Sequence, residues 1–194
     1  MGLDLTGVDL LTETVGTARL LLRPWRDDDV PDITLACNDA LISRWLSALP
    51  APYTESDARE YLAGIAVHER QERTGLSCAM QERVGKRLSG AIGLGGLTDT
   101  HGAVFGYWVA PWARGRGYAA EATDALSRWA FSHGVHRVWL LAAAGNLASQ
   151  RTAELAGFTR EGVLRESHRD RVGVRMNMVL FGRLSTDPAP PLRP

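Results

Sequence analysis

The sequence predicts an α+β domain built on a mixed, mostly antiparallel central sheet with flanking helices. Two observations support this fold class. Strand-like segments occur early as a hairpin in residues 76–97, and a strand–helix–strand crossover occurs late, in residues 104–142. A doubly wound dinucleotide-binding fold would begin with its crossover instead. The chain has 194 residues, of which 45% are hydrophobic, and this is enough for one sizeable core.

Composition and charge exclude several classes of protein. The 22 basic residues balance the 22 acidic ones, so net charge gives no support for a nucleic-acid or membrane-surface partner. No apolar stretch has the length of a membrane span, and the N-terminus has no secretory signal pattern. Cys37 and Cys78 have neither metal-binding nor redox spacing. Two reduced thiols are typical of a cytoplasmic protein, which is the location we expect.

The N-terminal half combines a strand with two helices. Residues 1–16 show little pattern, and we expect a loosely packed N-terminal leader before a single domain over residues 17–184. An apolar segment over residues 18–24 ends at a proline and predicts the first strand. Three aspartates precede a short helix over residues 30–37, since acidic side chains favour a helix N-terminus. Thr54-Glu55-Ser56-Asp57 resembles a capping box and predicts a helix that reaches about residue 73.

The C-terminal half alternates strands, turns and helices. Glycines and charged turns separate its apolar segments, and helical spacing distinguishes two of them from the rest. The predicted strands are 76–81, 88–97, 104–110, 135–142, 158–164 and 175–184, with a turn at 99–102 and helices over 117–134 and 146–156. Residues 185–194 are rich in proline and are expected to form a disordered tail.

An anion site is predicted where the strand over residues 104–110 meets the following helix. Pro111 ends the strand, a basic turn with two glycines follows, and the helix begins at about Gly117. The first N–H groups of a helix have no internal partner, and the helix dipole is positive there. Glycine lets the backbone approach a phosphate closely, and Arg114 and Arg116 add positive charge.

Two cofactors could use this device. Gly115-x-Gly117-x-x-Ala120 fits the dinucleotide fingerprint, but that motif needs an acidic residue after the next strand. Here the next strand leads into Ala143-Ala144-Gly145-Asn146, which has no carboxylate. The second cofactor is coenzyme A, because Arg114-x-x-Gly117-x-Ala119 matches the R/Q-x-x-G-x-G/A signature of N-acetyltransferases. An ordinary strand-to-helix turn with exposed arginines is the third interpretation.

Over residues 17–184 the chain resembles the GNAT superfamily of N-acetyltransferases. Within it the chain is similar to the bacterial ribosomal-protein N-terminal acetyltransferases of the RimJ/RimL type. Six stretches carry the resemblance through their order and spacing: Leu20-Leu21-Leu22-Arg23-Pro24-Trp25, Gly106-Tyr107-Trp108-Val109-Ala110-Pro111, Arg114 to Ala119, Asn146-x-x-Ser149, Ala156-Gly157-Phe158 and Glu161-Gly162-Val163-Leu164-Arg165.

The resemblance implies acetyl-CoA as donor, an amine as acceptor and no metal. It places the pyrophosphate against the backbone N–H groups of Arg114, Gly115, Arg116, Gly117, Tyr118 and Ala119. It places the pantetheine arm and the thioester beside Trp108, Val109 and Ala110, in a gap where this strand diverges from the next. Extended ligands pair with open strand edges in this way. Gly106 is expected to mark a bulge in the same strand.

Asn146 and Ser149 have two interpretations. From the residues alone, asparagine three positions before serine is typical of a helix N-cap. The resemblance adds a catalytic role to each. Asn146 would hold the pantetheine arm or a water molecule. Ser149 would give a proton to the departing thiolate, which leaves more readily once it is protonated.

The general base departs from the family pattern. Val104 stands where this subgroup often carries a glutamate, so a base on that strand is not expected. His168 is the best of three remaining candidates, with Glu161 and Glu166, because an ordinary histidine titrates near neutral pH. From its context alone, His168 is also consistent with an exposed loop residue. His133-x-x-His136 flanks a helix-capping glycine and is interpreted as structural rather than as a metal pair.

The function predicted is that of an acetyl-CoA-dependent N-acetyltransferase that transfers acetyl directly to a primary amine in a ternary complex. The acceptor is a protein N-terminal α-amine or a small-molecule amine, selected by residues 26–75 and by a loop at 165–175. No nucleic-acid or membrane partner is expected, and a homodimer stays open. Two alternatives remain: a catalytically idle acetyl-CoA-binding or interaction module of the same fold, and a nicotinamide-dependent enzyme.

Overall fold

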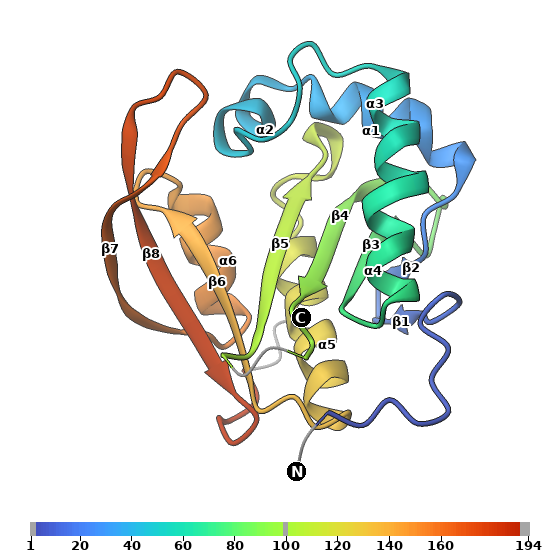
Figure 1. Ribbon diagram of the computed structural model, residues 1–194, viewed down its shortest axis with the longest axis vertical. Coiled ribbons are helices and arrows are strands. Elements are labelled where there is room, and N and C mark those ends of the chain that lie inside the picture. The colour runs from blue at the N-terminus through green and yellow to red at the C-terminus, as the bar shows by residue number, and fades with distance from the viewer. Residues whose placement is uncertain (1–2, 99–100, 191–194) are drawn as a thin grey trace.

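One mixed sheet organises the computed structural model, which describes residues 3–98 and 101–190 (Figure 1). The strand order across the eight-stranded sheet is β1-β2-β3-β4-β5-β6-β8-β7. The strands are β1 (Val15–Gly16), β2 (Leu20–Arg23), β3 (Gly75–Glu82), β4 (Leu88–Gly95), β5 (Ala103–Val109), β6 (Arg137–Ala143), β7 (Thr159–Arg169) and β8 (Arg175–Leu184). All neighbouring strands are antiparallel except β5 and β6, which confirms the predicted fold class.

Helices cover both faces of this sheet (Figure 1). They are η1 (Asp27–Asp29), α1 (Val30–Cys37), α2 (Ala40–Trp45), α3 (Glu55–Tyr61), the π-helical η2 (Leu62–Ala66), α4 (Val67–Gln71), η3 (Pro111–Ala113), α5 (Tyr118–Ser132) and α6 (Leu147–Leu155). Apolar side chains of α5, such as Leu126, form the larger core on one face. Val30, Ile33 and Tyr53 belong to a smaller core on the other face, with α1 and α3.

The two central strands β5 and β6 separate along their length. Pairing between them is limited to Ala103 with Val138 and Val104 with Trp139. Beyond these pairs β5 continues to Val109 without a partner on that side, and Figure 1 shows the two strands diverging toward the top of the view. The gap that the resemblance implied is therefore present in the sheet.

Local sequence signals account for most element boundaries. Thr54 accepts a hydrogen bond from the Asp57 N–H at 3.2 Å and forms the predicted capping box of α3. Gly117 is the N-cap residue of α5 with φ of +75°, a left-handed conformation that favours glycine. A buried ion pair between Arg23 and Asp29, at 2.7 Å, joins the end of β2 to η1. The acidic stretch before α1 thus has a tertiary role besides its helix preference.

Several expectations differ from the structure. Gly106 does not mark a bulge, because it pairs with Gly93 in an uninterrupted β4–β5 register. The loop expected over residues 165–175 is largely strand, since pairing with β8 carries β7 to Arg169 after a register shift between Leu164 and His168. The helix α2 was not predicted, although its N-cap residue Asp39 accepts two backbone N–H groups. Strand β1 was also missed, because only its pairing with β2 defines it.

The two ends of the chain are packed more closely than their sequences indicate. In the leader, Leu10 is 1% exposed and belongs to the larger core. Its carbonyl accepts a hydrogen bond from the buried Arg70 side chain. In the predicted tail, the Ser185 N–H donates to the His136 carbonyl at 2.9 Å. Residues 1–2, 99–100 and 191–194 lie outside the described residues, so part of the predicted leader, turn and tail is not addressed.

Candidate active site

A cleft of about 460 Å³ lies on the face of the sheet that α1, α3 and α4 cover. Paired residues on neighbouring strands project to the same face, so rows of side chains form its floor. The rows across β3, β4 and β5 are Gly75–Gly95–Val104, Ser77–Gly93–Gly106 and Ala79–Ala91–Trp108. Most of these residues have a small side chain or none. The sheet therefore leaves space above its floor that no core side chain fills.

Aromatic side chains form much of the cleft wall. Trp25 and Tyr61 pack edge to face with ring centroids 6.0 Å apart. Both also contact Ser77, because the Trp25 indole donates to its hydroxyl at 3.0 Å and the Tyr61 hydroxyl lies 2.8 Å from the same atom. Tyr53 and Trp108 extend the aromatic lining. These contacts hold the rings in place before any ligand binds.

The N-terminus of α5 offers a row of unpaired backbone donors. Within residues 3–98 and 101–190, the N–H groups from Arg114 to Ala120 have no acceptor. Gly115 and Gly117 both have φ of +75°, and a side chain at Gly115 would meet no atom within 4 Å. The turn is thus open to solvent, with its donors at the positive end of a 15-residue helix.

The two arginines of this turn have acidic partners. Arg114 forms an ion pair with Asp39, the N-cap residue of α2, and its hydrogen bond lowers the pKa of that carboxyl. Arg116 pairs with Glu82 at 3.1 Å and is half exposed. Their positive charge is therefore partly compensated, and the backbone N–H groups are the main anion-binding feature of the turn.

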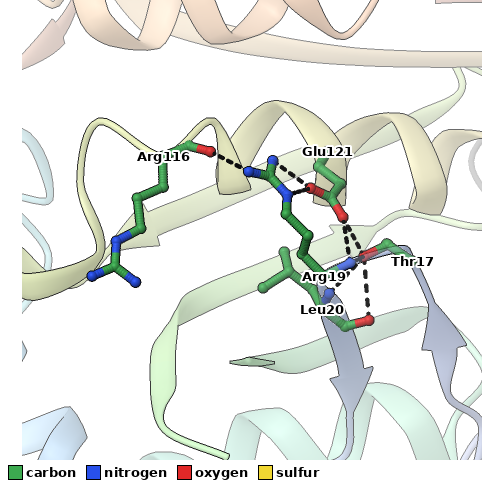
Figure 2. A network of polar contacts seen from close by, with 5 residues as sticks. All are labelled: Thr17, Arg19, Leu20, Arg116 and Glu121. Atoms are coloured by element: carbon green, nitrogen blue, oxygen red, sulfur yellow. Dashed lines mark hydrogen bonds and ion pairs between the residues drawn. The ribbon is translucent and has the colours of Figure 1, made fainter. Parts of the chain in front are cut away.

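A polar network braces the turn from the start of β2 (Figure 2). Arg19 donates to the Arg116 carbonyl at 2.9 Å and to the Glu121 carboxylate at 2.6 Å. Thr17 donates to the other Glu121 oxygen at 2.6 Å. Burial raises the pKa of Glu121, but the hydrogen bonds from Thr17 and Arg19 outweigh it, so the pKa lies below its ordinary value. Glu121 is therefore ionised at neutral pH.

Backbone groups of β5 point into the gap beside β6. The Ala110 N–H donates to the Ser89 carbonyl at 2.9 Å, so this donor is already used by the start of β4. Backbone groups alternate in direction along an antiparallel strand. The N–H groups of Tyr107 and Val109 therefore face away from β4, into the gap. Of the three residues expected to meet the pantetheine arm, Val109 has its backbone donor there, whereas the Trp108 side chain faces the cleft.

A pair of hydroxyl groups lies on the opposite face of β5 from the cleft. The Tyr107 hydroxyl is 2.9 Å from Ser149 Oγ and 3.2 Å from the Ser149 carbonyl. Burial raises the pKa of Tyr107, and the hydrogen bond with Ser149 lowers it only in part, so the phenol is protonated at neutral pH. Asn146 caps α6 by accepting the Ser149 N–H at 3.2 Å through Oδ1, as its spacing predicted. Its amide nitrogen is left to donate elsewhere.

Comparison with known proteins identifies the family of the chain. A family model described as acetyltransferase (GNAT) domain matches residues 19–159, well over half of the chain. The chain belongs to the GNAT acetyltransferase family. The expected enzyme class, an acyltransferase that uses acetyl-CoA, is thereby confirmed.

Individual relatives agree with the family. The uncharacterized N-acetyltransferase YoaA of Bacillus subtilis is 29% identical over 152 residues, which span 77% of this acetyltransferase and 85% of YoaA. RimJ of Mycobacterium smegmatis, solved with CoA-disulfide, has a TM-score of 0.79 at 20% identity, covering 90% of this chain and 88% of RimJ. A spermidine N-acetyltransferase of Vibrio cholerae, solved with CoA and spermine, has a TM-score of 0.73 at 21% identity. The match covers 88% of this chain and 98% of the spermidine N-acetyltransferase. At these identities the two structures show a common fold.

None of the predicted bases of this acetyltransferase lines the cleft. His168 is on the exposed edge strand β7, with its Nδ1 3.1 Å from the Ser167 hydroxyl, and it is not among the cleft-lining residues. Glu161 pairs with Arg137, and this hydrogen bond lowers the pKa of Glu161. Glu166 is exposed, in a left-handed turn of β7 with φ of +50°. The structure brings none of the three to the cleft.

Three residues of the site were missed by sequence reasoning. Tyr107 was considered only as part of a strand, although its hydroxyl contacts Ser149. Cys37 lines the cleft, where burial raises the pKa of its thiol to about 12. Glu69 is the one carboxylate among the described residues of the lining. Glu69 stands in a highly charged segment that reads as solvated surface, so no local signal distinguishes it.

The described residues hold neither a membrane-spanning helix nor a metal-binding cluster. No helix among the described residues is long and apolar enough to span a membrane. The same part of the chain holds no cluster of three histidine, cysteine, aspartate or glutamate residues suited to a metal ion, and His133 instead contacts the Trp129 carbonyl at 2.7 Å.

Proposed function

We propose that this acetyltransferase moves the acetyl group of acetyl-CoA directly onto a primary amine held in the cleft. The observation that carries the proposal is the divergence of β5 from β6, which leaves the β6-side edge of β5 unpaired beside the cleft-lining residues Gly106 and Trp108. The donor would enter along one face of the sheet and the acceptor along the other. The acceptor class, a protein N-terminal α-amine or a small-molecule amine, stays open at this point.

The residues present fit coenzyme A. Backbone N–H groups from Arg114 to Ala119 can hold a pyrophosphate, since the turn is open at Gly115 and the helix dipole is positive there. The Tyr107 and Val109 backbone groups can pair with the amides of a pantetheine arm as a neighbouring strand would. Both solved relatives described above contain coenzyme A or a CoA disulfide. Bound acetyl-CoA supplies an activated thioester whose carbonyl carbon accepts the amine.

Gly106 is the residue of β5 at which the gap beside β6 can be reached from the cleft. Its Cβ direction is toward the cleft, and an added methyl group there would meet no atom within 4 Å. The strand is unpaired on the β6 side at this position. A thioester beside Gly106 is therefore reachable from the cleft, and the adjacent N–H groups in the gap can polarise its carbonyl as oxyanion donors do.

Ser149 supplies the proton for the thiolate, and Tyr107 supports it. When the Tyr107 hydroxyl donates to Ser149 Oγ rather than to the Ser149 carbonyl, the serine proton is free to point at the sulfur. Asn146 fixes the first turn of α6 and so positions Ser149. The assignments of Asn146, Ser149 and His168 to catalysis remain predictions, as do the domain limits at residues 17 and 184.

Direct transfer is favoured over a covalent acyl-enzyme. A cysteine nucleophile must be a thiolate. Burial raises the pKa of Cys37 to about 12 and that of Cys78 to about 11, so both are protonated thiols at neutral pH. Cys78 also lies entirely inside the larger core. The amine itself is then the nucleophile that attacks the thioester.

Thiol release with a panel of amines tests the proposal. The purified protein with acetyl-CoA is offered 2-phenylethylamine, spermine and a peptide with a free N-terminus, and free thiol is measured against time. We expect release with at least one amine and acetylated product by mass spectrometry. Binding of acetyl-CoA without any turnover favours the idle module instead, and tighter binding of NAD than of CoA favours the nicotinamide-dependent alternative.

A further inference from the structure

The cleft contains a carboxylate that lies close to the row of Val104. Glu69 projects from α4 over the sheet, and a methyl group at Gly75 would be 3.2 Å from Glu69 Oε2. Gly75 pairs with Gly95, and Gly95 pairs with Val104. All three point to the face that carries the cleft.

Two glycines keep the space between Glu69 and Val104 open. A methyl group at Gly95 would be 3.8 Å from Val104 Cγ1, so the valine side chain leans over this glycine from the other side. Glu69 and Val104 therefore flank the same bare stretch of strand. A carboxylate that β5 lacks at Val104 is supplied at this row by a helix distant in sequence.

Glu69 is half buried, and among the described residues its carboxylate has no hydrogen-bond or ion-pair partner. Burial raises its pKa, and only His68 on the same helix opposes this. Tyr61 of α3 is the other titratable group that faces it, and the strands contribute none at this row. Burying a carboxylate without a partner is costly, which favours a cationic ligand as the missing partner.

We propose that Glu69 binds the amine of the acceptor in the cleft and takes the proton that this amine must lose. This inference rests on the proposed function. The amine nitrogen forms a bond to the thioester carbonyl carbon, and the carbon–sulfur bond breaks. The proton of the attacking nitrogen passes to Glu69 and is then released to water. The departing thiolate receives its proton from Ser149, whose hydroxyl recovers a proton from water.

The lining also indicates the body of the acceptor. Around Glu69 and the rows of small residues, the cleft presents Trp25, Tyr61 and Trp108 together with aliphatic side chains. Aromatic faces attract an alkylammonium and cover an apolar body. A single carboxylate matches a single positive charge. The acceptor we infer is a primary amine attached to an apolar or aromatic group, for which 2-phenylethylamine is a compact probe.

Substitution of Glu69→Gln tests the proposal with the intact protein. With 2-phenylethylamine and acetyl-CoA, we expect kcat to fall about a hundredfold, the usual scale for a positioned base. The KM for the amine should rise, and the KM for acetyl-CoA should stay unchanged. The matched control is Glu60→Gln, an exposed glutamate of α3 outside the cleft, which should behave as the unsubstituted protein.

The pH profile separates a base from a structural residue. In the unsubstituted protein, kcat/KM should fall as acid protonates Glu69, at a pH above the ordinary glutamate range because burial raises its pKa. This limb should be absent from Glu69→Gln. The variant should unfold at the same or a higher temperature, since it removes an unpartnered buried carboxylate. A lower melting temperature with the pH limb retained would assign Glu69 a structural role and overturn the proposal.

A second substitution places the carboxylate on β5. Val104→Glu in the Glu69→Gln background should restore at least part of kcat, because Glu69 lies at Gly75 and Val104 at Gly95, two residues paired in the same row. If a folded double variant that binds acetyl-CoA shows no recovery of kcat, the claim that Glu69 and a carboxylate at residue 104 serve the same place in the cleft is overturned.

The remaining outcomes separate the two proposals. Full activity of Glu69→Gln overturns this inference and leaves the proposed function intact. Acetylation of spermine or the peptide but not of 2-phenylethylamine overturns the acceptor chemistry and also leaves acetyl transfer intact. Absence of thiol release with every amine removes both.

Discussion

The two sides of the candidate site are built in different ways. On the donor side, the turn from Arg114 to Gly117 presents backbone N–H groups, and its arginines are already paired with carboxylates. On the acceptor side, the cleft is defined by side chains from α1, α3, α4 and three strands. A site lined by backbone N–H groups recognises the anionic group of a ligand and is little affected by which side chains surround it. A side-chain-lined site is specific for the ligand that its particular residues fit.

This difference explains why family membership constrains the donor more than the acceptor. The donor site needs glycine at two positions of positive φ and a helix that begins immediately afterwards. The acceptor site can change through any of its lining residues without affecting the turn. The two sides should therefore respond independently to substitution.

Gly117→Glu should abolish acetyl-CoA binding measured by titration calorimetry. The new side chain and its negative charge would stand in the pyrophosphate site, and the left-handed φ of +75° adds roughly 1–2 kcal/mol of strain. Gly85→Glu is the matched control, because Gly85 has φ of +78° and open surroundings in the β3–β4 turn. The control should lose similar stability and keep its affinity. If the affinity of Gly117→Glu for acetyl-CoA is unchanged, the pyrophosphate does not bind at this turn.

Ser149→Ala should lower kcat about a hundredfold, with little change in the KM for acetyl-CoA. Tyr107→Phe should have a smaller effect, because we place Tyr107 behind Ser149 rather than at the sulfur. If the tyrosine acts through the serine, the two effects will not add in the double variant. Lower stability with turnover intact would instead reduce Ser149 to a residue of the α6 cap.

Glu121→Gln should lower the free energy of unfolding by about 1.5–3 kcal/mol at pH 7, the scale of hydrogen bonds to a charged group. The pKa of Glu121 is lowered in the folded state, so its stabilisation is present above the ordinary glutamate pKa and is lost as pH falls through the folded value. Urea unfolding curves of the two proteins should therefore converge in acid. Glu55→Gln, at an exposed i,i+4 ion pair, is the control and should change stability by less than about 0.5 kcal/mol.

His168→Gln should have the smallest effect, leaving turnover and its rise with pH unchanged. Besides the acid limb assigned to Glu69, a second rise at higher pH is set by the pKa of the acceptor amine, so this second rise should move to higher pH as more basic acceptors are used. His168 lies on the exposed face of β7 outside the cleft. A limb that stays near pH 6.5 for every acceptor and disappears in His168→Gln would identify His168 as the base in place of Glu69.

The sequence by itself determined the features that depend on a few adjacent residues. The glycine turn, the start of α5, the Thr54 capping box and the Asn146 cap each follow from local backbone and side-chain hydrogen bonding. The order of hairpins and crossover was sufficient for the fold class. Each of these features depends on interactions between residues only a few positions apart, so the residue types that cause it stand together in the sequence.

Tertiary structure alone decided which side chains meet. Tyr107 reaches Ser149 across 42 positions of sequence, and Glu69 reaches the row of Val104 only because Gly75 and Gly95 lie between them in the sheet. Pairing with β8 turned the expected loop at residues 165–175 largely into strand, and His168 on that strand is not among the cleft-lining residues. The physical reason is that strand register and helix packing bring distant residues together. Neither leaves a pattern in the neighbouring sequence.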